Sequence, residues 1–358
     1  MKPLLHDLLV VELASVLAGP DVGMFFAEMG AKVIKIENKK TQGDVTRKWK
    51  TPSEKENAAG VTAYFSSVNW NKTHLLYDLS DKNDYHAVME WISKADVLIV
   101  NFKPGDDKKF RLDYVSLQKK YPHLIYGAIN GYGSESTKVA YDVVLQAETG
   151  FMSINGTPES GPLKMPVALI DVLAAHQLKE GLLLALLNRF KTGKGAFVEV
   201  SLFDAALASL KNQATNWLMN GENSKLQGSL HPNIAPYGET FQTKDQQWIV
   251  LAVGTDQQFV KLLEVLDNHH LINDERFATN VQRVKNRQVL HELLVPAFRE
   301  KTAQEINEQF SQYHIPFGNI NDIKTVFQEP AAQQLILEEN INGIPTKRVK
   351  TAVFKLKL

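Results

Sequence analysis

Short β-rich runs alternate with helical stretches over the first ~200 residues, and this alternation most constrains how the chain can fold. Leu8–Leu13 reads as a strand, and the break at Ala18-Gly19-Pro20 opens a helix that runs towards Met29. Gly30 stands where a helix C-cap is expected, and Ala31–Glu37 follows as a strand with apolar residues at alternate positions. Strands joined by helices predict βαβ units and a mainly parallel sheet, with ligands beyond the carboxyl ends of the strands.

The same alternation continues further along the chain. It predicts strands at His74–Leu79, Asp96–Asn101, His123–Asn130 and Phe197–Val200, and helices at Asp81–Ala95, Leu112–Tyr121, Val172–Phe190 and Leu202–Met219. Residues 220–237 are rich in Asn, Gly, Ser, Pro and Lys, which predicts a linker or crossing loop. A β-hairpin over Gly238–Val253 and helices at Asp256–Leu266 and Val284–Ala303 then predict a smaller α+β domain.

The composition excludes several classes of function. The 40 Lys and Arg residues balance the 40 Asp and Glu residues, so no global field draws the protein to nucleic acid or to a membrane surface. The absence of cysteine excludes a disulfide scaffold, a cysteine-ligated metal and a cysteine nucleophile. The longest apolar runs, such as Leu182–Leu187, fall far short of the ~20 residues of a membrane span. With no signal peptide in the first residues, we expect a cytoplasmic protein of about two to three domains.

Generic cofactor and metal motifs fail in this sequence. Gly131-Tyr132-Gly133 follows a strand, but Ser136 stands where a nicotinamide-binding fingerprint needs its third glycine. Neither a P-loop nor a Gly-x-Ser-x-Gly nucleophile elbow occurs. His269-His270 is the only close histidine pair and lies in a polar stretch, so we expect no metal site.

One carboxylate stands at the junction between an apolar run and a long apolar helix. Val167–Ile170 precede Asp171, and Val172–Ala175 continue the apolar pattern. One reading is a helix N-cap, for which Asp is among the preferred residues. The other is a covalent nucleophile, because a helix N-terminus holds a carboxylate ionised and apolar neighbours shield it from water. The residues at this junction are compatible with both readings.

A series of short motifs runs in a fixed order through nearly the whole chain. They are Val16–Pro20, Gly30–Glu37, Gly43–Arg47, Asn101–Gly105, Ala140–Ala147, the Asp171 segment, Lys191–Gly195, Val198–Ala205, His231–Gly238, Ala252–Asp256 and Asp274–Asn280. No single motif is decisive, but the ordered set resembles the class III coenzyme A transferases. That family includes formyl-CoA and carnitine CoA-transferases and the 2-methylacyl-CoA racemases.

The resemblance implies a fold and an assembly that composition does not show. It implies a Rossmann-like large domain built from both ends of the chain, with a smaller inserted domain. On this basis we expect a large CoA-binding domain at residues 1–224, a small α+β domain at 225–320, and a C-terminal segment, 321–358, that returns to the large domain. It also implies a homodimer in which two subunits are threaded through one another as interlocked rings.

The resemblance further implies a reaction and its nucleophile. The Asp at the position of Asp171 is the family's catalytic nucleophile, which forms an acyl anhydride and then a thioester with coenzyme A. Coenzyme A (CoA) is then a substrate rather than a tightly bound cofactor, and an acyl-CoA and a carboxylic acid are the partners. The expected CoA-binding positions are Val16, Leu17, Ala18, Asn38, Lys39, Tyr77, Asn101, Phe102, Lys109, Lys138 and Tyr141. The basic segment from Lys39 to Lys50, opposed only by Asp44, is expected to add positive charge for the phosphates.

Departures from the family pattern narrow the activity. Racemases of the family use a histidine where this chain has Tyr141, and a tyrosine with a pKa near 10 is a poor base, which favours transfer. Leu17 replaces a glutamine that assists catalysis in formyl-CoA transferase, so oxalate is not the expected acid. Asn38 replaces a CoA-contacting arginine, for which Lys39 can compensate. A CoA-transferase is therefore the leading hypothesis, with a 2-methylacyl-CoA racemase and a non-catalytic CoA-binding paralogue as alternatives.

Overall fold

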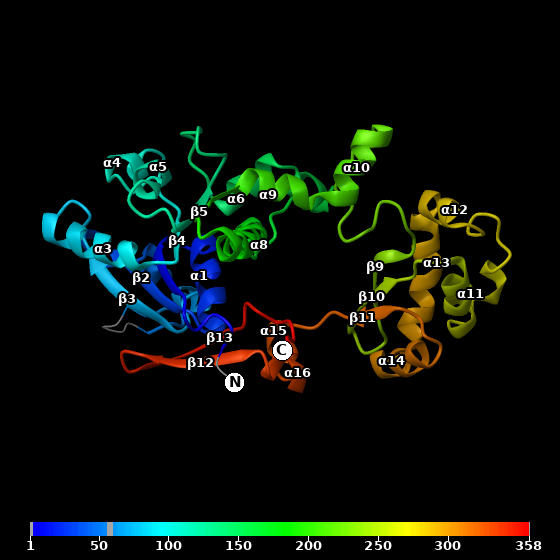
Figure 1. The fold of residues 1–358 in the computed structure, drawn as a ribbon. Helices are drawn as coiled ribbons and strands as arrows, with labels where there is room; N and C mark the ends of the chain where they lie inside the picture. Colours follow the sequence, from blue (N-terminus) through cyan, green and yellow to red (C-terminus); the bar gives the residue numbers. More distant parts are fainter. Residues whose placement is uncertain (1–2, 56–59, 358) are drawn as a thin grey trace. The chain divides into compact units, whose positions relative to one another are not determined.

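Six parallel strands form the central sheet of the chain (Figure 1). They are β1 (Leu9–Leu13), β2 (Lys32–Asn38), β3 (Lys72–Tyr77), β4 (Val97–Val100), β5 (Ile125–Asn130) and β8 (Phe197–Ser201). The structure is a computed structural model, and it describes residues 3–55 and 60–357. The predicted mainly parallel sheet is confirmed, and the predicted strand boundaries agree with these within two residues.

The order of the strands fixes where a ligand can bind. The sheet runs β3-β2-β1-β4-β5-β8, so the chain moves outward from β1 to β3 and then returns to the other side of β1 with β4. This is the strand order of doubly wound nucleotide-binding folds, in which the crevice at the reversal point binds the ligand. The reversal point here lies between the carboxyl ends of β1 and β4.

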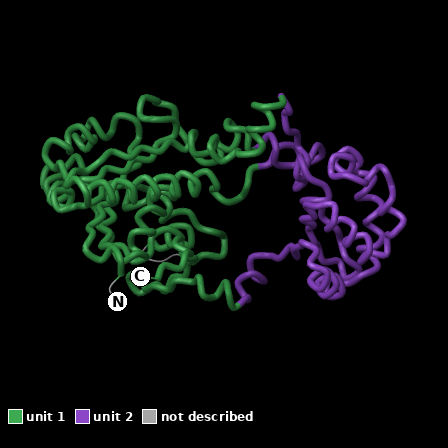
Figure 2. Tube along the Cα trace, turned by 45° about the vertical axis from the view of Figure 1, so that its right-hand side comes forward, with its two compact units in different colours: residues 1–151, 164–220, 330–358 green, residues 152–163, 221–329 purple. Residues whose placement is uncertain are grey.

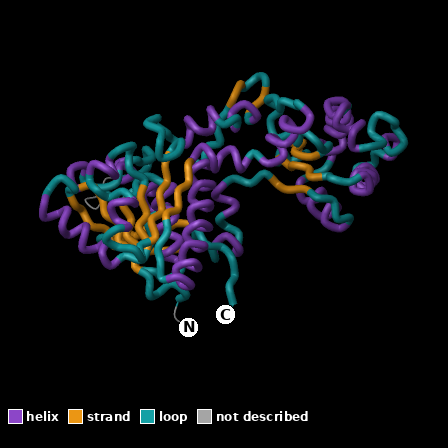
Figure 3. Tube along the Cα trace, turned by 45° about the horizontal axis from the view of Figure 1, so that its top comes forward, coloured by secondary structure: helices purple, strands orange, loops and turns teal. Residues whose placement is uncertain are grey.

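Helices pack on both faces of this sheet, and Figure 3 shows the strands between them. One face carries α1 (Ala18–Glu28), α8 (Leu169–Thr192) and α9 (Leu202–Ser209), and the other carries α3 (Lys82–Lys94) and α5 (Tyr114–Gln118). Val10 packs into the first apolar cluster and its neighbour Val11 into the second. Because successive side chains of a strand point to opposite faces, a strand covered on both sides is apolar at most of its positions.

The remaining elements of the chain are short. In the first half they are η1 (Lys39–Thr41), η2 (Val45–Lys48), α2 (Ala63–Ser67), α4 (Asp106–Lys109), α6 (Asp142–Glu148), α7 (Phe151–Ile154), β6 (Gly156–Thr157) and β7 (Gly161–Pro162). Later they are α10 (Lys211–Asn220), α15 (Ile323–Val326), α16 (Pro330–Gln333), β12 (Ile336–Ile341) and β13 (Ile344–Val349).

The chain divides into two compact units, which Figure 2 distinguishes by colour. Unit 1 comprises residues 1–151, 164–220 and 330–358, and unit 2 comprises residues 152–163 and 221–329. Residues 152–163 thus belong to unit 2, although they lie between two segments of unit 1 along the chain. The C-terminal segment is tied to α1, because the amides of Thr351 and Ala352 donate to the Glu28 carboxylate at 2.7 and 2.8 Å.

Unit 2 has its own core and its own sheet. Its strands β9 (Tyr237–Gln242), β10 (Trp248–Ala252) and β11 (Phe317–Asn319) form an antiparallel sheet in the order β11-β10-β9. Its helices are α11 (Asp256–Val265), η3 (His269–Leu271), α12 (Asn280–Lys285), α13 (Arg287–Glu300) and α14 (Ala303–Gln312). The predicted hairpin of β9 and β10 is confirmed, with Lys244-Asp245 in its turn.

Two predicted helices are wrong in extent. The helix predicted over Leu202–Met219 is divided into α9 and α10, because Lys211 adopts a left-handed φ of 41°. The helix predicted over Val284–Ala303 is α13, preceded by the separate α12 and followed by α14, which starts from a capping box at Thr302. Within the described residues, none of the helices combines the length and the apolarity that a bilayer span demands.

Candidate active site

The turn that follows β1 meets the loop that follows β4 at the reversal point of the sheet. The Asn101 side chain accepts a hydrogen bond from the Ser15 amide at 2.9 Å and donates one to the Ser15 carbonyl at 2.8 Å. Gly19, the second residue of α1, lies beside this clamp, where an added Cβ would lie 2.4 Å from the Ala14 Cβ. Asn101, which was predicted from the sequence as a CoA-binding residue, therefore also holds the strand-to-helix turn in place.

Asp171 lies in the first turn of α8 and not at its N-cap. The helix begins at Leu169, so Asp171 is its third residue, and the N-cap residue, Ala168, offers no side-chain cap. Asp142 of α6 satisfies this helix end instead, because its Oδ1 accepts the Ile170 amide hydrogen at 2.7 Å. The N-cap reading of Asp171 is therefore wrong, and the Asp171 carboxylate is not used to cap the helix.

The environment of Asp171 favours the protonated, neutral form of its side chain, whereas its place in the sequence indicated an ionised carboxylate. Its side chain is buried, with 8% of the residue exposed. Burial, followed by repulsion from the Asp142 carboxylate, raises the pKa of Asp171 to about 7. The expectation that the helix terminus holds this group ionised is thus wrong in direction, because the helix end does not outweigh these two effects. A carboxyl group poised near neutral pH is typical of active sites.

Asp142 is itself held by a network that the sequence reading did not assign. Its Oδ2 accepts a hydrogen bond from Gln146 Nε2 at 2.6 Å. The side-chain oxygen of Gln146, Oε1, accepts the Met165 amide hydrogen at 2.8 Å, which ties α6 to the segment that leads into α8. Asp142 and Gln146 therefore fix the position of the first turn of α8. Both lie in the motif Ala140–Ala147, whose order along the chain was the only signal for them.

Tyr64 of α2 also lies near the carboxylates, and nothing in the sequence pointed to it. Burial and the charges of Asp171, Asp142 and Asp44 raise the pKa of Tyr64 to about 12, so its hydroxyl stays protonated. Its ring contacts that of Trp49 edge-on, with centroids 5.0 Å apart. The carboxylates of Asp171 and Asp44 therefore both act on one phenol, although they are far apart in sequence.

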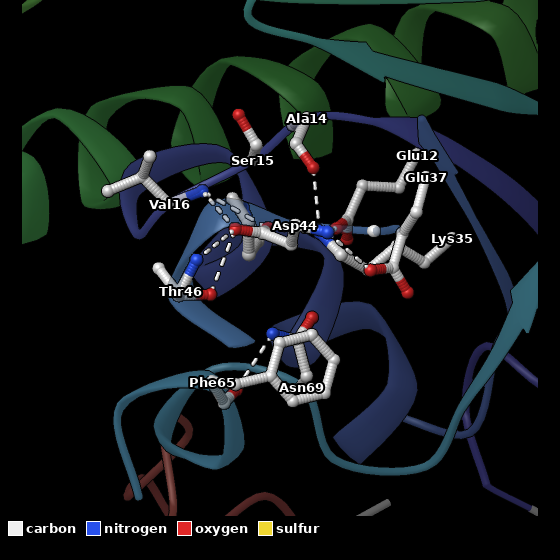
Figure 4. Close-up of polar contacts among 12 residues, drawn as sticks. Glu12, Ala14, Ser15, Val16, Lys35, Glu37, Asp44, Thr46, Phe65 and Asn69 are labelled. Carbon is white, nitrogen blue, oxygen red and sulfur yellow. Dashed lines mark hydrogen bonds and ion pairs between the residues drawn. The ribbon is translucent and has the colours of Figure 1, made fainter. Parts of the chain in front are cut away.

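Three predicted CoA-binding positions, Val16, Leu17 and Ala18, lie between the end of β1 and the first residue of α1. The Val16 amide already donates to the Asp44 carboxylate, at 3.2 Å to Oδ2 and 3.4 Å to Oδ1, as Figure 4 shows. Leu17 is the N-cap residue of α1 and offers no side-chain cap. The first-turn N–H groups of Ala18 and Gly19 therefore face no capping side chain, and such groups are suited to an anion.

The other predicted CoA-binding residues lie at the carboxyl edge of the same sheet or in the segments that follow it. Asn38 and Tyr77 are the last residues of β2 and β3, Phe102 follows β4, Lys109 ends α4, Lys138 follows β5, and Tyr141 is the N-cap residue of α6. Carboxyl ends of parallel strands meet at one edge, so the fold brings segments from five strands together. The Asn38 side chain caps η1 by accepting the Lys40 amide hydrogen.

Several of the basic residues that were predicted to bind CoA or its phosphates have carboxylate partners within unit 1. Lys39 Nζ lies 3.2 Å from Asp84, and Lys138 Nζ lies 2.5 Å from Glu148. Arg47 Nη2 donates to Glu37 at 2.6 Å, so the segment Lys39–Lys50 is opposed by more carboxylates than Asp44 alone. The positive charge expected from this segment is therefore partly neutralised inside the protein.

Comparison with known proteins assigns this arrangement to a family. The model of CoA-transferase family III matches residues 5–356. A succinate–glutarate CoA-transferase of Agrobacterium fabrum is 35% identical over a 339-residue alignment that covers 93% of this chain and 84% of the relative. A succinyl-CoA:glutarate CoA-transferase of Mus musculus is 33% identical over a 366-residue alignment that covers 99% of this chain and 82% of the relative.

A solved structure agrees with these sequence matches. The crystal structure of a CAIB/BAIF family protein from Brucella suis superposes with a TM-score of 0.85 at 35% sequence identity, covering 99% of this chain and 93% of that one. The chain thus belongs to CoA-transferase family III and is a class III CoA-transferase that uses CoA thioesters.

Replacing Asp171 by Asn should stabilise the protein at neutral and alkaline pH. Because folding raises the pKa of this acid, its contribution to stability is fully present below the unfolded pKa and is lost as pH rises to about 7. Asp171→Asn should therefore gain roughly 2–4 kcal/mol of unfolding free energy at pH 8, and the gain should shrink towards pH 5. Urea unfolding of both proteins between pH 5 and pH 8 measures it.

Asp204→Asn is the matched control, because Asp204 is likewise the third residue of its helix, α9, but is exposed. Its effect on stability should not grow with pH. A stability difference between Asp171→Asn and wild type that is constant from pH 5 to pH 8 would contradict the raised pKa.

Proposed function

We propose that the enzyme moves CoA from an acyl-CoA to a carboxylic acid, with Asp171 as the covalent nucleophile. The observation that carries this proposal is the Asp171 carboxylate itself, buried in the first turn of α8 and not engaged as a helix cap. It lies in a chain whose family relatives are CoA-transferases. A partly desolvated carboxylate attacks an acyl carbon more readily than a fully hydrated one.

The first half of the reaction transfers the acyl group and then CoA to the enzyme. An Asp171 oxygen attacks the thioester carbonyl carbon, the C–S bond breaks, and the CoA thiolate departs. The product on the enzyme is a mixed anhydride between Asp171 and the acyl group. The thiolate then attacks the Asp171 carbonyl carbon, and the C–O bond of the anhydride breaks. The products are a thioester between Asp171 and CoA and the free donor carboxylate.

The second half repeats these steps with the acceptor acid. The acceptor carboxylate attacks the aspartyl thioester, which releases thiolate and forms a new anhydride. Attack of the thiolate on the acceptor acyl carbon gives the new acyl-CoA and restores the Asp171 carboxylate. Every bond broken is an activated acyl bond, so no nucleoside triphosphate is needed.

Each attack creates an oxyanion, and the structure narrows its candidate donors. The Val16 amide is occupied by Asp44, whereas α1 begins with no side-chain cap over Ala18 and Gly19. We assign the oxyanion to this helix end, where one well-placed donor contributes about 3–4 kcal/mol. The CoA-binding positions predicted from the sequence remain part of this proposal.

The names of the relatives favour dicarboxylic acids as substrates. Both relatives described above carry glutarate in their names, and one carries succinate and the other succinyl-CoA. We therefore propose succinyl-CoA as the donor and glutarate or an acid of similar length as the acceptor. Tyr141, at the N-cap of α6, leaves the site without the histidine that the racemase hypothesis needs.

The wild-type enzyme should convert succinyl-CoA and glutarate to glutaryl-CoA and succinate without ATP. Asp171→Asn should lose more than about a thousandfold in kcat, as expected when a covalent nucleophile is removed. Incubation with acyl-CoA and hydroxylamine should place a hydroxamate on residue 171, detected by mass spectrometry. Full activity of Asp171→Asn, or deuterium uptake at Cα of a 2-methylacyl-CoA without any acceptor acid, would exclude the transferase mechanism.

The kcat/KM of the enzyme should fall with decreasing pH below about 7, because the nucleophile is the ionised form of Asp171. Asp142→Asn removes the second cause of the raised pKa, so the acidic limb should move to lower pH while burial keeps it above the ordinary range of an Asp. Measurement of kcat/KM from pH 5 to pH 9 tests this. The exposed Asp204→Asn variant should follow wild type, and an Asp142→Asn profile that does not move would contradict the assignment.

We also propose that the enzyme is a homodimer, as the family resemblance implied. In the isolated chain the outer side of α8 exposes Leu183, Leu184, Leu187 and Phe190, the last with 91% of its surface accessible. The end of α10 exposes Trp217, Leu218 and Met219. Apolar side chains gathered on helix surfaces in this way are typical of a protein interface.

Sedimentation should therefore give a dimer for wild type. The double variant Leu184→Asp/Phe190→Asp should shift the equilibrium towards monomer, because it places charges in the proposed interface. Val115→Asp alters another exposed apolar residue, on α5 at the opposite face of the sheet, and should leave the dimer intact. A monomeric wild type at micromolar concentration would contradict the proposal.

A further inference from the structure

Val16 adopts a backbone conformation that a β-branched residue rarely takes. Its φ is 72°, in the left-handed region, and it lies in the turn between β1 and α1. Such a conformation persists only when neighbouring groups hold it there. Ser15 is clamped by Asn101, but the amide of Val16 itself is held by the Asp44 carboxylate.

The Asp44 carboxylate is fully engaged in the protein interior. It is 4% exposed and accepts the amide and the hydroxyl hydrogen of Thr46, at 3.0 and 2.9 Å, in addition to the Val16 amide. Lys35 Nζ lies 3.2 Å from its Oδ2. Figure 4 shows these contacts converging on Asp44 from separate segments of the chain. Any movement of this carboxylate must break several hydrogen bonds at once.

Lys35 is in turn held by a second buried carboxylate. Its ammonium donates to Glu12 at 2.8 Å and to the Ala14 carbonyl at 2.7 Å, and Glu12 also accepts Lys72 at 2.7 Å. Burial alone would lower the pKa of Lys35, but Glu12, Asp44 and Glu37 overcome burial and raise it. Two carboxylates and two ammonium groups thus form a neutral buried chain that ends on the amide of Val16.

We infer that Asp44 is a positioning residue, which holds Val16 in the left-handed conformation and thereby shapes the start of α1 for the acyl-CoA. This inference rests on the proposed function, in which that helix end binds CoA and the oxyanion. The charges of Asp44 and Asp171 both contribute to the raised pKa of Tyr64, so the two carboxylates lie near the same phenol. Asp44 does not react; it acts through the turn that it holds.

The Asp44→Asn variant tests the inference by ligand binding. In Asn one carboxylate oxygen becomes an NH2 group, which cannot accept a hydrogen bond, so either the Val16 and Lys35 side or the Thr46 side loses its acceptor. The negative charge opposite Lys35 is also lost, so the turn should relax. The Kd for free CoA, measured by calorimetry, and the KM for acyl-CoA should each rise about 10- to 100-fold, since a small misplacement near a reacting group has effects of this size. The kcat at saturation should change less than the KM.

Asp96→Asn is the matched control. Asp96 accepts the Leu9 amide at 2.7 Å and pairs with Arg189 at 3.1 Å, so it holds the opposite end of β1 by the same chemistry. This variant should alter stability while leaving the Kd for CoA unchanged. If Asp44→Asn also changes only stability, its role is structural and the inference is wrong.

Val16→Gly supplies a readout that a structural role would not give. Glycine adopts a positive φ without strain, so in this background the turn no longer depends on Asp44. In the Val16→Gly background, Asp44→Asn should raise the Kd for CoA by no more than about threefold. In the wild-type background, which keeps Val16, the same substitution should raise it about 10- to 100-fold. Equal effects in both backgrounds would overturn the inference.

Hydrogen exchange separates the inference from the proposed function. Amides in a peptide spanning residues 14–19 should exchange faster in Asp44→Asn than in wild type or Asp96→Asn, whether or not the enzyme transfers CoA. Wild type that binds CoA but transfers none would refute the proposed function alone.

If Asp44→Asn does not fold, the double variant Lys35→Met/Asp44→Asn, which removes both charges, is measured instead. The same rise in the Kd for CoA is expected. Unchanged hydrogen exchange together with an unchanged Kd would overturn the inference.

Discussion

The buried carboxylate of Glu12, held between two ammonium groups, sets the arrangement on which the rest of unit 1 depends. Lys35 comes from β2 and Lys72 from β3, so one side chain of β1 links three adjacent strands. Removing one member would leave an unpaired charge in the interior, which is far more destabilising than losing a surface pair. Gly23 of α1 is explained by the same group, because a Cβ there would lie 1.8 Å from Glu12 Oε2. Glycine has a low helix propensity, but at this position it allows α1 to pack directly against the buried Glu12 carboxylate.

The same rule, that a buried charge needs partners, distinguishes Asp171 from the structural carboxylates. Asp44 is saturated by hydrogen bonds and Glu12 by two ammonium groups, whereas burial and a second carboxylate act against the charge of Asp171. A group that is destabilised when ionised raises the free energy of the folded enzyme. In the proposed mechanism the carboxylate loses this charge when it bonds to an acyl carbon, so the instability of the ionised form would favour bond formation.

The sequence predicted the parts of this molecule that depend on local pattern. Alternating strands and helices gave the parallel sheet, and the carboxyl edge of that sheet carries most of the predicted site residues. The sequence pattern did not predict that the helix breaks at Lys211 or that Asp142 caps α8, since both depend on neighbours distant in the chain. Tyr64 was missed for the same reason. The ionisation of Asp171 was predicted in the wrong direction, because helix position is visible in a sequence and burial beside another carboxylate is not.

Charge pairing also decides which cations remain available to a phosphate-bearing substrate. Lys39 and Lys138 have carboxylate partners, but both lysines are more than half exposed, and such pairs contribute little to stability. In the proposed CoA site, a phosphate would replace Asp84 or Glu148 at small cost, and water would solvate the released carboxylate. Lys35 and Lys72 have no such freedom, because their side chains are inaccessible and their partners are fixed. A chain with equal numbers of basic and acidic residues can therefore bind a polyanion, provided that its exposed pairs lie at the ligand edge and its buried pairs hold the scaffold.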